Sequence, residues 1–177
     1  MFHHFHDDKL HKRGQGSMNK DDFYKIIKCV RTFSWIFSIQ AIRAAFFQGG
    51  RMINGVVIKK LTTHEDHRGF FREVFRFPAD FENIPVSQMS HSLVKEGVVK
   101  AWHSHRSQSQ WNYIVSGQAR VVLFDFRPDS KTYREIVSLQ IDQEIEPTAY
   151  FFPSGVLHGY GCQRGPMHII YVSSELY

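Results

Sequence analysis

Three histidines have a spacing that indicates chemistry in this chain. His103, His105 and Gln110 lie within residues 97–117, a segment that begins and ends with glycine, and His158 follows a Pro-Ser-Gly turn. Alternate residues of a β-strand point to one face, so we expect His103 and His105 to project together. The pattern predicts a site built on strands.

The first chemistry to consider is metal binding. Neutral imidazoles from His103, His105 and His158 could hold a divalent metal, with Gln110 as a weak fourth oxygen ligand. Such a centre normally includes a carboxylate, and a neutral amide in its place should weaken metal binding. A metal-dependent small-molecule enzyme with this three-histidine site is therefore an alternative hypothesis, and a site without metal or other cofactor is the leading one.

Length and composition indicate one globular domain behind a basic leader. The chain has 177 residues, of which 42% are hydrophobic, and a formal net charge of +5. Residues 1–51 contain nine Lys/Arg against four Asp/Glu, whereas residues 52–177 contain thirteen of each. Because the domain itself is balanced, we do not expect nucleic acid as a partner.

The cysteines and the apolar runs favour a cytoplasmic protein. Cys29 and Cys162 are the only cysteines, and they form neither a CxxC pair nor a disulfide framework. The apolar run at residues 32–42 is shorter than the roughly 20 residues that a membrane span needs. We therefore expect no transmembrane segment, and no signal peptide is evident.

The chain divides into three parts. Residues 1–17, rich in histidine, resemble a disordered or tag-like extension. Residues 18–51 predict a basic amphipathic helical segment, because apolar residues recur there near helical spacing without proline. Residues 52–177 form the third part, in which short runs of Val, Ile, Phe and Tyr alternate with turn residues. This third pattern predicts an all-β jelly roll, with strands near residues 56–61, 70–77, 86–94, 98–103, 111–115, 119–126, 133–139, 149–152 and 167–173.

The histidine segments resemble the two cupin motifs, with Gln110 where the first motif usually carries Glu. Further matches narrow the resemblance. Collinear segments over about residues 54–177 resemble the dTDP-4-dehydrorhamnose 3,5-epimerase family of the cupin superfamily: residues 66–73 (DHRGFFRE), 88–92 (QMSHS), 97–103 (GVVKAWH), 125–132 (DFRPDSKT), 152–160 (FPSGVLHGY) and Tyr171. The resemblance implies a cupin jelly-roll barrel with an N-terminal helical extension.

The family resemblance also implies metal-free proton chemistry on a dTDP-4-keto-6-deoxy sugar. His103 stands at the position of the family's base, and its imidazole suits proton transfer near neutral pH. Tyr171 stands at the position of the family's acid. Gln110 replaces a Lys that would stabilise the enolate oxygen, so we expect slower carbanion formation or a different substrate.

Other departures concern substrate binding and the orientation of the base. Lys100 replaces an Arg, which keeps the charge and loses the bidentate fork. The carboxylate that orients the family's base has no match by residue 177, so Glu73 or another residue would take that part. The resemblance makes six residues candidates for binding the nucleotide sugar: Arg68, Glu73, Gln88, Lys100, Gln110 and His158.

Simpler interpretations accompany these assignments. Arg68 and Glu73 could form a structural ion pair, and His158 could only hydrogen-bond the backbone. Four aromatic residues, Phe70, Phe71, Trp102 and Trp111, are expected in the core more often than in a base-stacking surface. A non-catalytic sugar-nucleotide binding module is a further alternative. The resemblance also predicts a homodimer.

Overall fold

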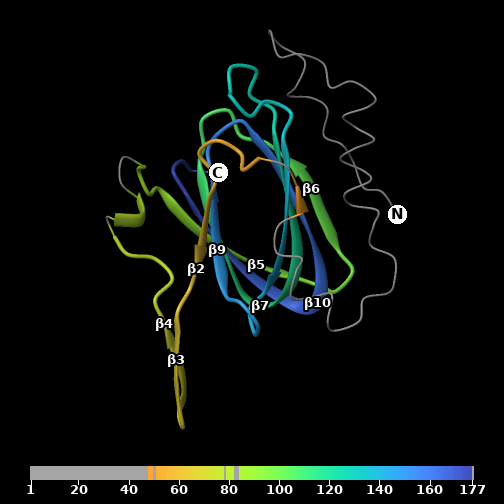
Figure 1. Ribbon diagram of the computed structural model, residues 1–177. Coiled ribbons are helices and arrows are strands. Elements are labelled where there is room, and N and C mark those ends of the chain that lie inside the picture. Colours follow the sequence, from red (N-terminus) through yellow and green to blue (C-terminus); the bar gives the residue numbers. More distant parts are fainter. Residues whose placement is uncertain (1–47, 50, 78, 82–83, 177) are drawn as a thin grey trace.

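The computed structural model describes residues 48–49, 51–77, 79–81 and 84–176, and Figure 1 shows that they build a curved antiparallel β-structure. The strands are β1 (Gln48–Gly49), β2 (Val57–Lys60), β3 (Thr63–Asp66), β4 (Gly69–Arg72), β5 (Gln88–Val94), β6 (Val99–His103), β7 (Gln110–Asp125), β8 (Ile136–Asp142), β9 (Thr148–Phe152) and β10 (Val156–Ser173). A short 3₁₀ helix spans Ala79–Phe81. The predicted all-β class is confirmed.

Two long strands, β7 and β10, belong to both walls of the fold. The first half of β7 pairs with β9 and with the second half of β10, which in turn pairs with β5. The second half of β7 pairs with β8 and with the first half of β10, which in turn pairs with β6. We call these the β5 wall and the β6 wall. Both strands change wall where the β10 register shifts, between Cys162 and Ile169.

Gly117 permits the bend in β7. Its φ is +92°, a conformation that favours glycine, and a Cβ there would lie 2.6 Å from the carbonyl oxygen of Arg164. The glycine that closes the histidine segment therefore has a structural role. It lets the two walls enclose one interior.

The main core lies between the walls. It includes Ile114 and Ile169 of the β5 wall and Val121, Leu123 and Leu139 of the β6 wall, all nearly inaccessible to solvent. A second apolar cluster covers the outer face of the β5 wall; its buried members are Leu61, Phe81, Trp111, Tyr113, Ala149, Phe151 and Val172. Alternate residues of β9 thus pack on opposite faces, which explains why this strand is buried along its whole length.

The strands differ from the sequence expectation in several places. The expected strand 70–77 ends at Arg72, and the expected strand 133–139 is shifted to Ile136–Asp142. The expected strands 111–115 and 119–126 are one strand, β7, because Gly117 bends the chain without breaking the ladder. The expected strand 167–173 begins much earlier, at Val156. Polar residues at Thr63–Asp66 form β3, which the apolar pattern did not indicate.

Figure 1 shows that the β3–β4 hairpin projects away from the rest of the fold. Phe70 and Phe71 near its tip are 61% and 68% exposed. The expectation that they belong to the core is wrong. The hairpin forms its own two-stranded sheet, so it has no second layer to cover these rings.

The extension 1–17 and nearly all of the expected helical segment 18–51 lie outside the described residues. Gln48–Gly49 are not helical, because they pair with β8 as β1. The sheet thus includes residues before the expected domain start at 52. In the described part of the chain, no helix has the length and apolarity that crossing a membrane requires.

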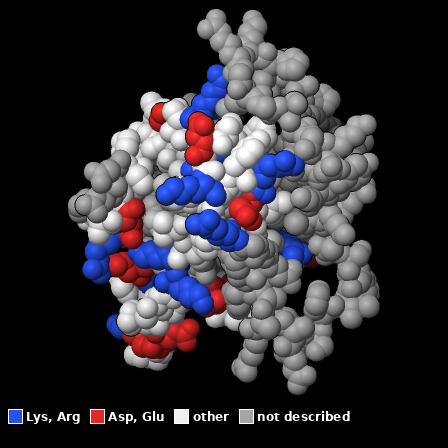
Figure 2. Space-filling view, turned by 45° about the horizontal axis from the view of Figure 1, so that its top comes forward, with Lys and Arg blue, Asp and Glu red and all other residues white. Residues whose placement is uncertain are grey.

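Surface charge is mixed on the face that Figure 2 shows. Lys and Arg side chains are interspersed with Asp and Glu over the described residues. Among the described residues, Lys59 pairs with Asp80 and Arg76 pairs with Glu73. The described residues of this face therefore form no continuous positive surface of the kind that binds a polyanion.

Candidate active site

A cavity of about 370 Å³ lies between the two walls. It contains polar groups from both, and its lining residues are Gln88, Ser90, Ser92, Lys100, His103, His105, Gln108, Gln110, Asn112, Val121, Tyr150, His158, Gly159, Tyr160, Tyr171 and Ser173. A space of this size matches ligand pockets for small molecules.

The strand register arranges the β5 wall of the cavity in two rows. Ser90, Tyr171, Asn112 and Tyr150 are successive cross-strand partners on β5, β10, β7 and β9. The neighbouring row, two residues along each strand, consists of Gln88, Ser173, Gln110 and Phe152. Directly opposed residues point to the same face, so each row presents adjacent side chains to the cavity.

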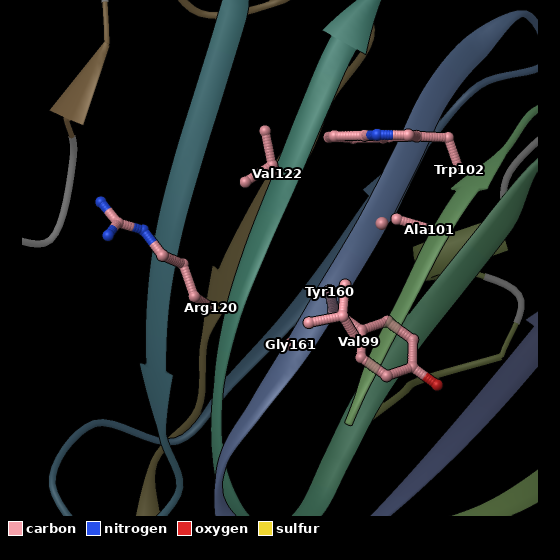
Figure 3. Close-up of a pocket in the computed structure, with 8 residues that line it drawn as sticks. Val99, Ala101, Trp102, Arg120, Val122, Tyr160 and Gly161 are labelled. Atoms are coloured by element: carbon pink, nitrogen blue, oxygen red, sulfur yellow. The ribbon is translucent and has the colours of Figure 1, made fainter. Parts of the chain in front are cut away.

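A bulge shapes the β6 wall. His103 pairs with His158 and Lys100 pairs with Tyr160, so Ala101 and Trp102 together oppose the single residue Gly159. Residues three apart on a regular strand point to opposite faces, but the extra residue brings Lys100 and His103 to the same cavity. Figure 3 shows Ala101 and Trp102 beside Val122 and Arg120, in a shallow depression outside that cavity.

Substitution of Gly159 with Ala should disturb this bulge. A Cβ at Gly159 would lie 2.6 Å from the Ala101 Cβ and 3.2 Å from the Lys100 carbonyl oxygen. We expect Gly159→Ala to lower the free energy of unfolding by about 1–3 kcal/mol, measured by urea denaturation, because overpacking forces the backbone to move. Adding Ala101→Gly removes the closest atom and should restore part of the loss. Equal stability of Gly159→Ala and the wild type would contradict this account.

His158 is a neutral imidazole with a defined tautomer. Its Nδ1 lies 3.1 Å from the carbonyl oxygen of Val156, which can only accept, so Nδ1 carries the proton and Nε2 has a free lone pair. Burial, together with the neighbouring His105 and His103, lowers the pKa of His158 to about 3, although the bond to the Val156 carbonyl opposes the shift. The ring stacks on Phe152 at 4.1 Å between centroids. His158 thus makes the expected backbone bond and also lines the cavity.

His105 lies in the loop after β6, next to His158. The two ring centroids are 5.5 Å apart, and the His103 centroid is 6.1 Å from that of His158. The backbone N–H of Gly155 donates to the His105 carbonyl, which fixes the loop against the turn before β10. Within the described residues, no three His, Cys, Asp or Glu side chains are arranged to hold a metal ion.

His103 has the properties of a base at neutral pH. Partial burial lowers the pKa of His103 below 6.5, and the positive charge of Lys100 lowers it further. The neutral form, which can accept a proton, therefore dominates at pH 7. Over the described part of the chain, no carboxylate hydrogen-bonds to His103; Glu73, the candidate for that part, pairs with Arg76 at 3.0 Å.

Tyr171 reaches across the cavity to the β6 wall. Its hydroxyl lies 2.6 Å from that of Tyr160, although both residues belong to β10, because the strand passes from one wall to the other between them. Burial, followed by this hydrogen bond, raises the pKa of Tyr160. Tyr160 therefore keeps its proton and can donate it to the Tyr171 oxygen. Burial also raises the pKa of Tyr150, at the end of the same row.

Gln110 is held by a second amide. Its Nε2 donates to Oδ1 of Asn112 at 2.6 Å, and both side chains are buried. Sequence reasoning identified Gln110 and overlooked Asn112 and Tyr160. Tyr160 ends the family-like segment 152–160, which could have drawn attention to it, whereas the signal for Asn112 is the cross-strand register that places it beside Tyr171.

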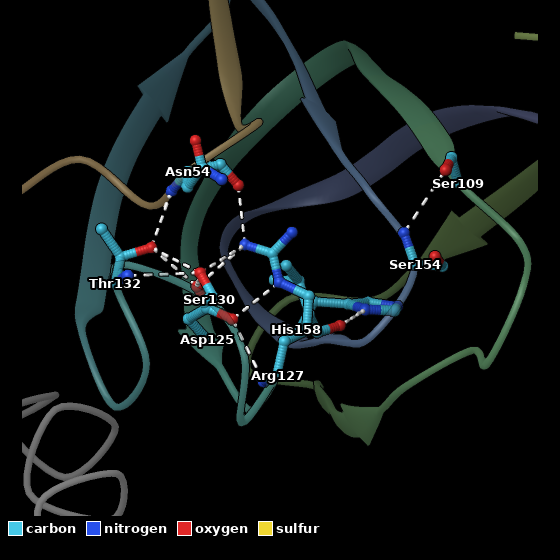
Figure 4. A network of polar contacts seen from close by, with 9 residues as sticks. Asn54, Ser109, Asp125, Arg127, Ser130, Thr132, Ser154 and His158 are labelled. Carbon is cyan, nitrogen blue, oxygen red and sulfur yellow. Dashed lines mark hydrogen bonds and ion pairs between the residues drawn. The ribbon is translucent and has the colours of Figure 1, made fainter.

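A buried carboxylate fixes the strand connections near the histidines. Asp125 at the end of β7 accepts hydrogen bonds from Arg127, Ser130 and Thr132 (Figure 4). Arg127 also donates to the carbonyl oxygen of Asn54. The predicted turn around residues 128–130 is therefore a clasp that joins the β7–β8 connection to the chain before β2.

The remaining sequence candidates are divided between the cavity and the surface. Gln88 and Lys100 line the cavity, and the Nε2 of Gln88 donates to Ser90 at 2.8 Å. Arg68 lies near the hairpin tip, pairs with Asp66 at 2.5 Å, and does not line the cavity. Neither does Glu73. The expectation of an ion pair between Arg68 and Glu73 is wrong, because Arg68 pairs with Asp66 and Glu73 pairs with Arg76.

Trp111 packs in the second core cluster and donates to the carbonyl oxygen of Asp80, so the core expectation for it is confirmed.

Comparison with known proteins identifies the family. The profile of the dTDP-4-dehydrorhamnose 3,5-epimerase family matches residues 51–177. The chain belongs to this family. It is therefore an enzyme of the isomerase type, as the sequence resemblance predicted.

Relatives support this assignment. The chain is 41% identical over 129 residues to the spore coat polysaccharide biosynthesis protein SpsL of Bacillus subtilis, an alignment that covers 71% of this chain and 83% of that protein. It is 27% identical over 130 residues to a dTDP-4-dehydrorhamnose 3,5-epimerase of Methanothermobacter thermautotrophicus, covering 71% and 70%.

A solved structure has the same fold. The epimerase RmlC of Legionella pneumophila, in complex with dTDP-4-keto-L-rhamnose, superposes with a TM-score of 0.65 at 21% identity, over 74% of this chain and 73% of that one. At this identity the likeness establishes the cupin-like fold alone. The fold and the family therefore rest on independent comparisons.

Proposed function

We propose that this protein is a nucleotide-sugar epimerase or isomerase that acts on a dTDP-4-keto-6-deoxy sugar, with His103 as base and Tyr171 as acid. One observation carries the proposal: the two residues line the same cavity from different walls. A sugar ring between them would present one face to each. Proton removal on one face and return on the other inverts the carbon between them.

The chemistry follows from the acidity of carbon next to a ketone. Neutral His103 removes the proton at C3 or C5, and the electron pair of that C–H bond forms an enolate with the C4 carbonyl. The Tyr171 hydroxyl then donates its proton to the same carbon from the opposite face. Tyr160 stabilises the resulting phenolate, because its hydroxyl lies 2.6 Å from the Tyr171 oxygen.

The other polar lining residues would hold the substrate. Lys100 offers a positive charge to a phosphate or a sugar hydroxyl, and Gln88 and His158 offer further hydrogen bonds. Gln110 would donate to the enolate oxygen in place of an ammonium group. This chemistry uses no metal or other cofactor.

Proton NMR in deuterated water tests the proposal. dTDP-4-keto-6-deoxyglucose is incubated with metal-stripped protein, and the C3 and C5 proton signals are followed. We expect one or both signals to disappear in the presence of protein. Exchange only after divalent metal is restored would support the three-histidine metal enzyme instead. Binding without exchange in either sample would indicate a sugar-nucleotide binding module.

A homodimer belongs to the same proposal. Phe70 and Phe71 on the projecting hairpin are exposed apolar rings that a second copy would cover, and that contact would carry Arg68 toward the partner. Light scattering should give twice the chain mass; a mass near 20.7 kDa would exclude the dimer. A reducing cytoplasm is the proposed location, where the buried free thiol of Cys162 remains reduced.

A further inference from the structure

Asn112 carries an unsatisfied hydrogen-bond donor in the cavity wall. The side chain is only 1% exposed, and its Nδ2 has no hydrogen-bond partner. A buried N–H₂ group without an acceptor loses its bonds to water and gains none in return, so such a group calls for an explanation. Because Asn112 lines the cavity, a bound molecule can supply the missing acceptor.

Which amide carries the free donor depends on the hydrogen bond between Asn112 and Gln110. Nε2 of Gln110 donates to Oδ1 of Asn112, which leaves the N–H₂ of Asn112 free. If both amides were rotated by 180°, Asn112 would donate and the N–H₂ of Gln110 would be free. Either arrangement leaves one N–H₂ group of the pair without a protein acceptor, in a residue that lines the cavity. Two neutral amides thus lie together at the position where the family resemblance implies a lysine.

The row on the β5 wall places Asn112 beside the proposed acid. Asn112 is the direct cross-strand partner of Tyr171 on one side and of Tyr150 on the other. A sugar carbon that receives a proton from Tyr171 is bonded to the carbonyl carbon. The keto oxygen is therefore close to the reacting carbon, and it can only accept hydrogen bonds, which complements a group that can only donate.

We infer that Asn112 is a substrate-binding residue whose amide, paired with Gln110, donates to the keto oxygen of the sugar. This inference rests on the proposed function and adds a residue to it. The oxygen gains negative charge as the enolate forms, so the donation strengthens during the reaction. A neutral donor holds this charge less strongly than an ammonium would, which agrees with the slower carbanion formation expected from the sequence.

The experiment compares two substitutions at this position. Asn112→Asp keeps the size and the bond from Gln110 but cannot donate, and Asn112→Val removes the amide. Gln118→Ala, on the same strand outside the cavity lining, is the control. Calorimetric titration with dTDP, exchange kinetics with dTDP-4-keto-6-deoxyglucose, and thermal melts are measured for each.

We expect both Asn112 variants to bind dTDP within about twofold of the wild type and to lose about 10²-fold in the kcat of exchange, the usual effect of removing one oxyanion donor. The control should match the wild type in each assay. Unchanged exchange by a folded Asn112→Asp or Asn112→Val protein would overturn the inference while leaving the proposed function intact.

Failure of the proposed function is a separate result. If the wild type catalyses no exchange, the epimerase proposal is wrong, and titration with the same keto sugar then decides the role of Asn112. Weaker binding of the keto sugar by Asn112→Val, with dTDP binding retained, would support the donor role. Equal binding, together with a higher melting temperature, would show that Asn112 is only a hydrated polar group.

Discussion

Replacing His103 with Asn is expected to reduce solvent deuterium incorporation into dTDP-4-keto-6-deoxyglucose by about 10²- to 10⁴-fold, the range for loss of a general base. Asn fits the same position and keeps a polar side chain on the β6 wall, but its amide cannot take up a proton. Affinity for dTDP should change little, because the base contacts the sugar. NMR exchange rates and calorimetric titration check the two expectations.

His91→Asn is the matched control for this experiment. His91 lies on the outer face of β5, where it is exposed and forms a 2.9 Å hydrogen bond with His168. It does not line the cavity, so its replacement should leave exchange unchanged. A His103→Asn protein that exchanges at the wild-type rate would remove His103 from the mechanism and direct attention to His105.

The exchange rate of the wild type should depend on pH through the protonation of His103. The pKa of His103 is lowered below 6.5, so the neutral base is already formed at pH 7. The rate should hold steady near neutrality and fall as the pH drops through the lowered pKa, where His103 becomes protonated. The acid limb should be absent from the residual activity of His103→Asn.

Replacing Asp125 with Asn is expected to lower the free energy of unfolding by about 3 kcal/mol. The Asp125 side chain is fully buried and holds three partners, and removing one member of such an ion pair leaves Arg127 without its counter-charge. Urea denaturation at pH 7 gives the loss. Asp66→Asn is the control, because the Asp66–Arg68 pair is exposed on the hairpin and should contribute little.

Acid titration of stability supplies a second measurement on Asp125. Burial alone would raise the pKa of this carboxyl, but hydrogen bonds from Arg127, Ser130 and Thr132 outweigh it and lower the pKa from 3.8 to about 2. The charged form therefore contributes about 2 kcal/mol above pH 4, and this contribution is lost as the pH falls from about 4 to 2. Asp125→Asn should lack this loss. An identical acid profile would show that the clasp is not stabilising.

The fold class, the family and several cavity residues could be predicted because their signals are local in the sequence. Short runs of Val, Ile, Phe and Tyr between turn residues indicate strands, and the family motifs name His103, Tyr171 and Gln110, which line one cavity. The same motifs assigned Arg68 and Glu73 to that site, but a hairpin that projects from the fold keeps them away from the cavity. Short-range patterns do not reveal where a hairpin points.

The sequence by itself determined the all-β class, the family, and the types of groups available for acid and base chemistry. Only the tertiary structure decided which groups meet. A bulge opposite Gly159 turns Lys100 and His103 to one face, a bend in β10 brings Tyr160 to Tyr171, and strand register sets Asn112 beside Tyr171. Each of these contacts joins residues that are distant in the sequence and meet only when their strands pair. Strand pairing depends on the packing of the whole sheet, and the apolar period of a single strand does not reveal it.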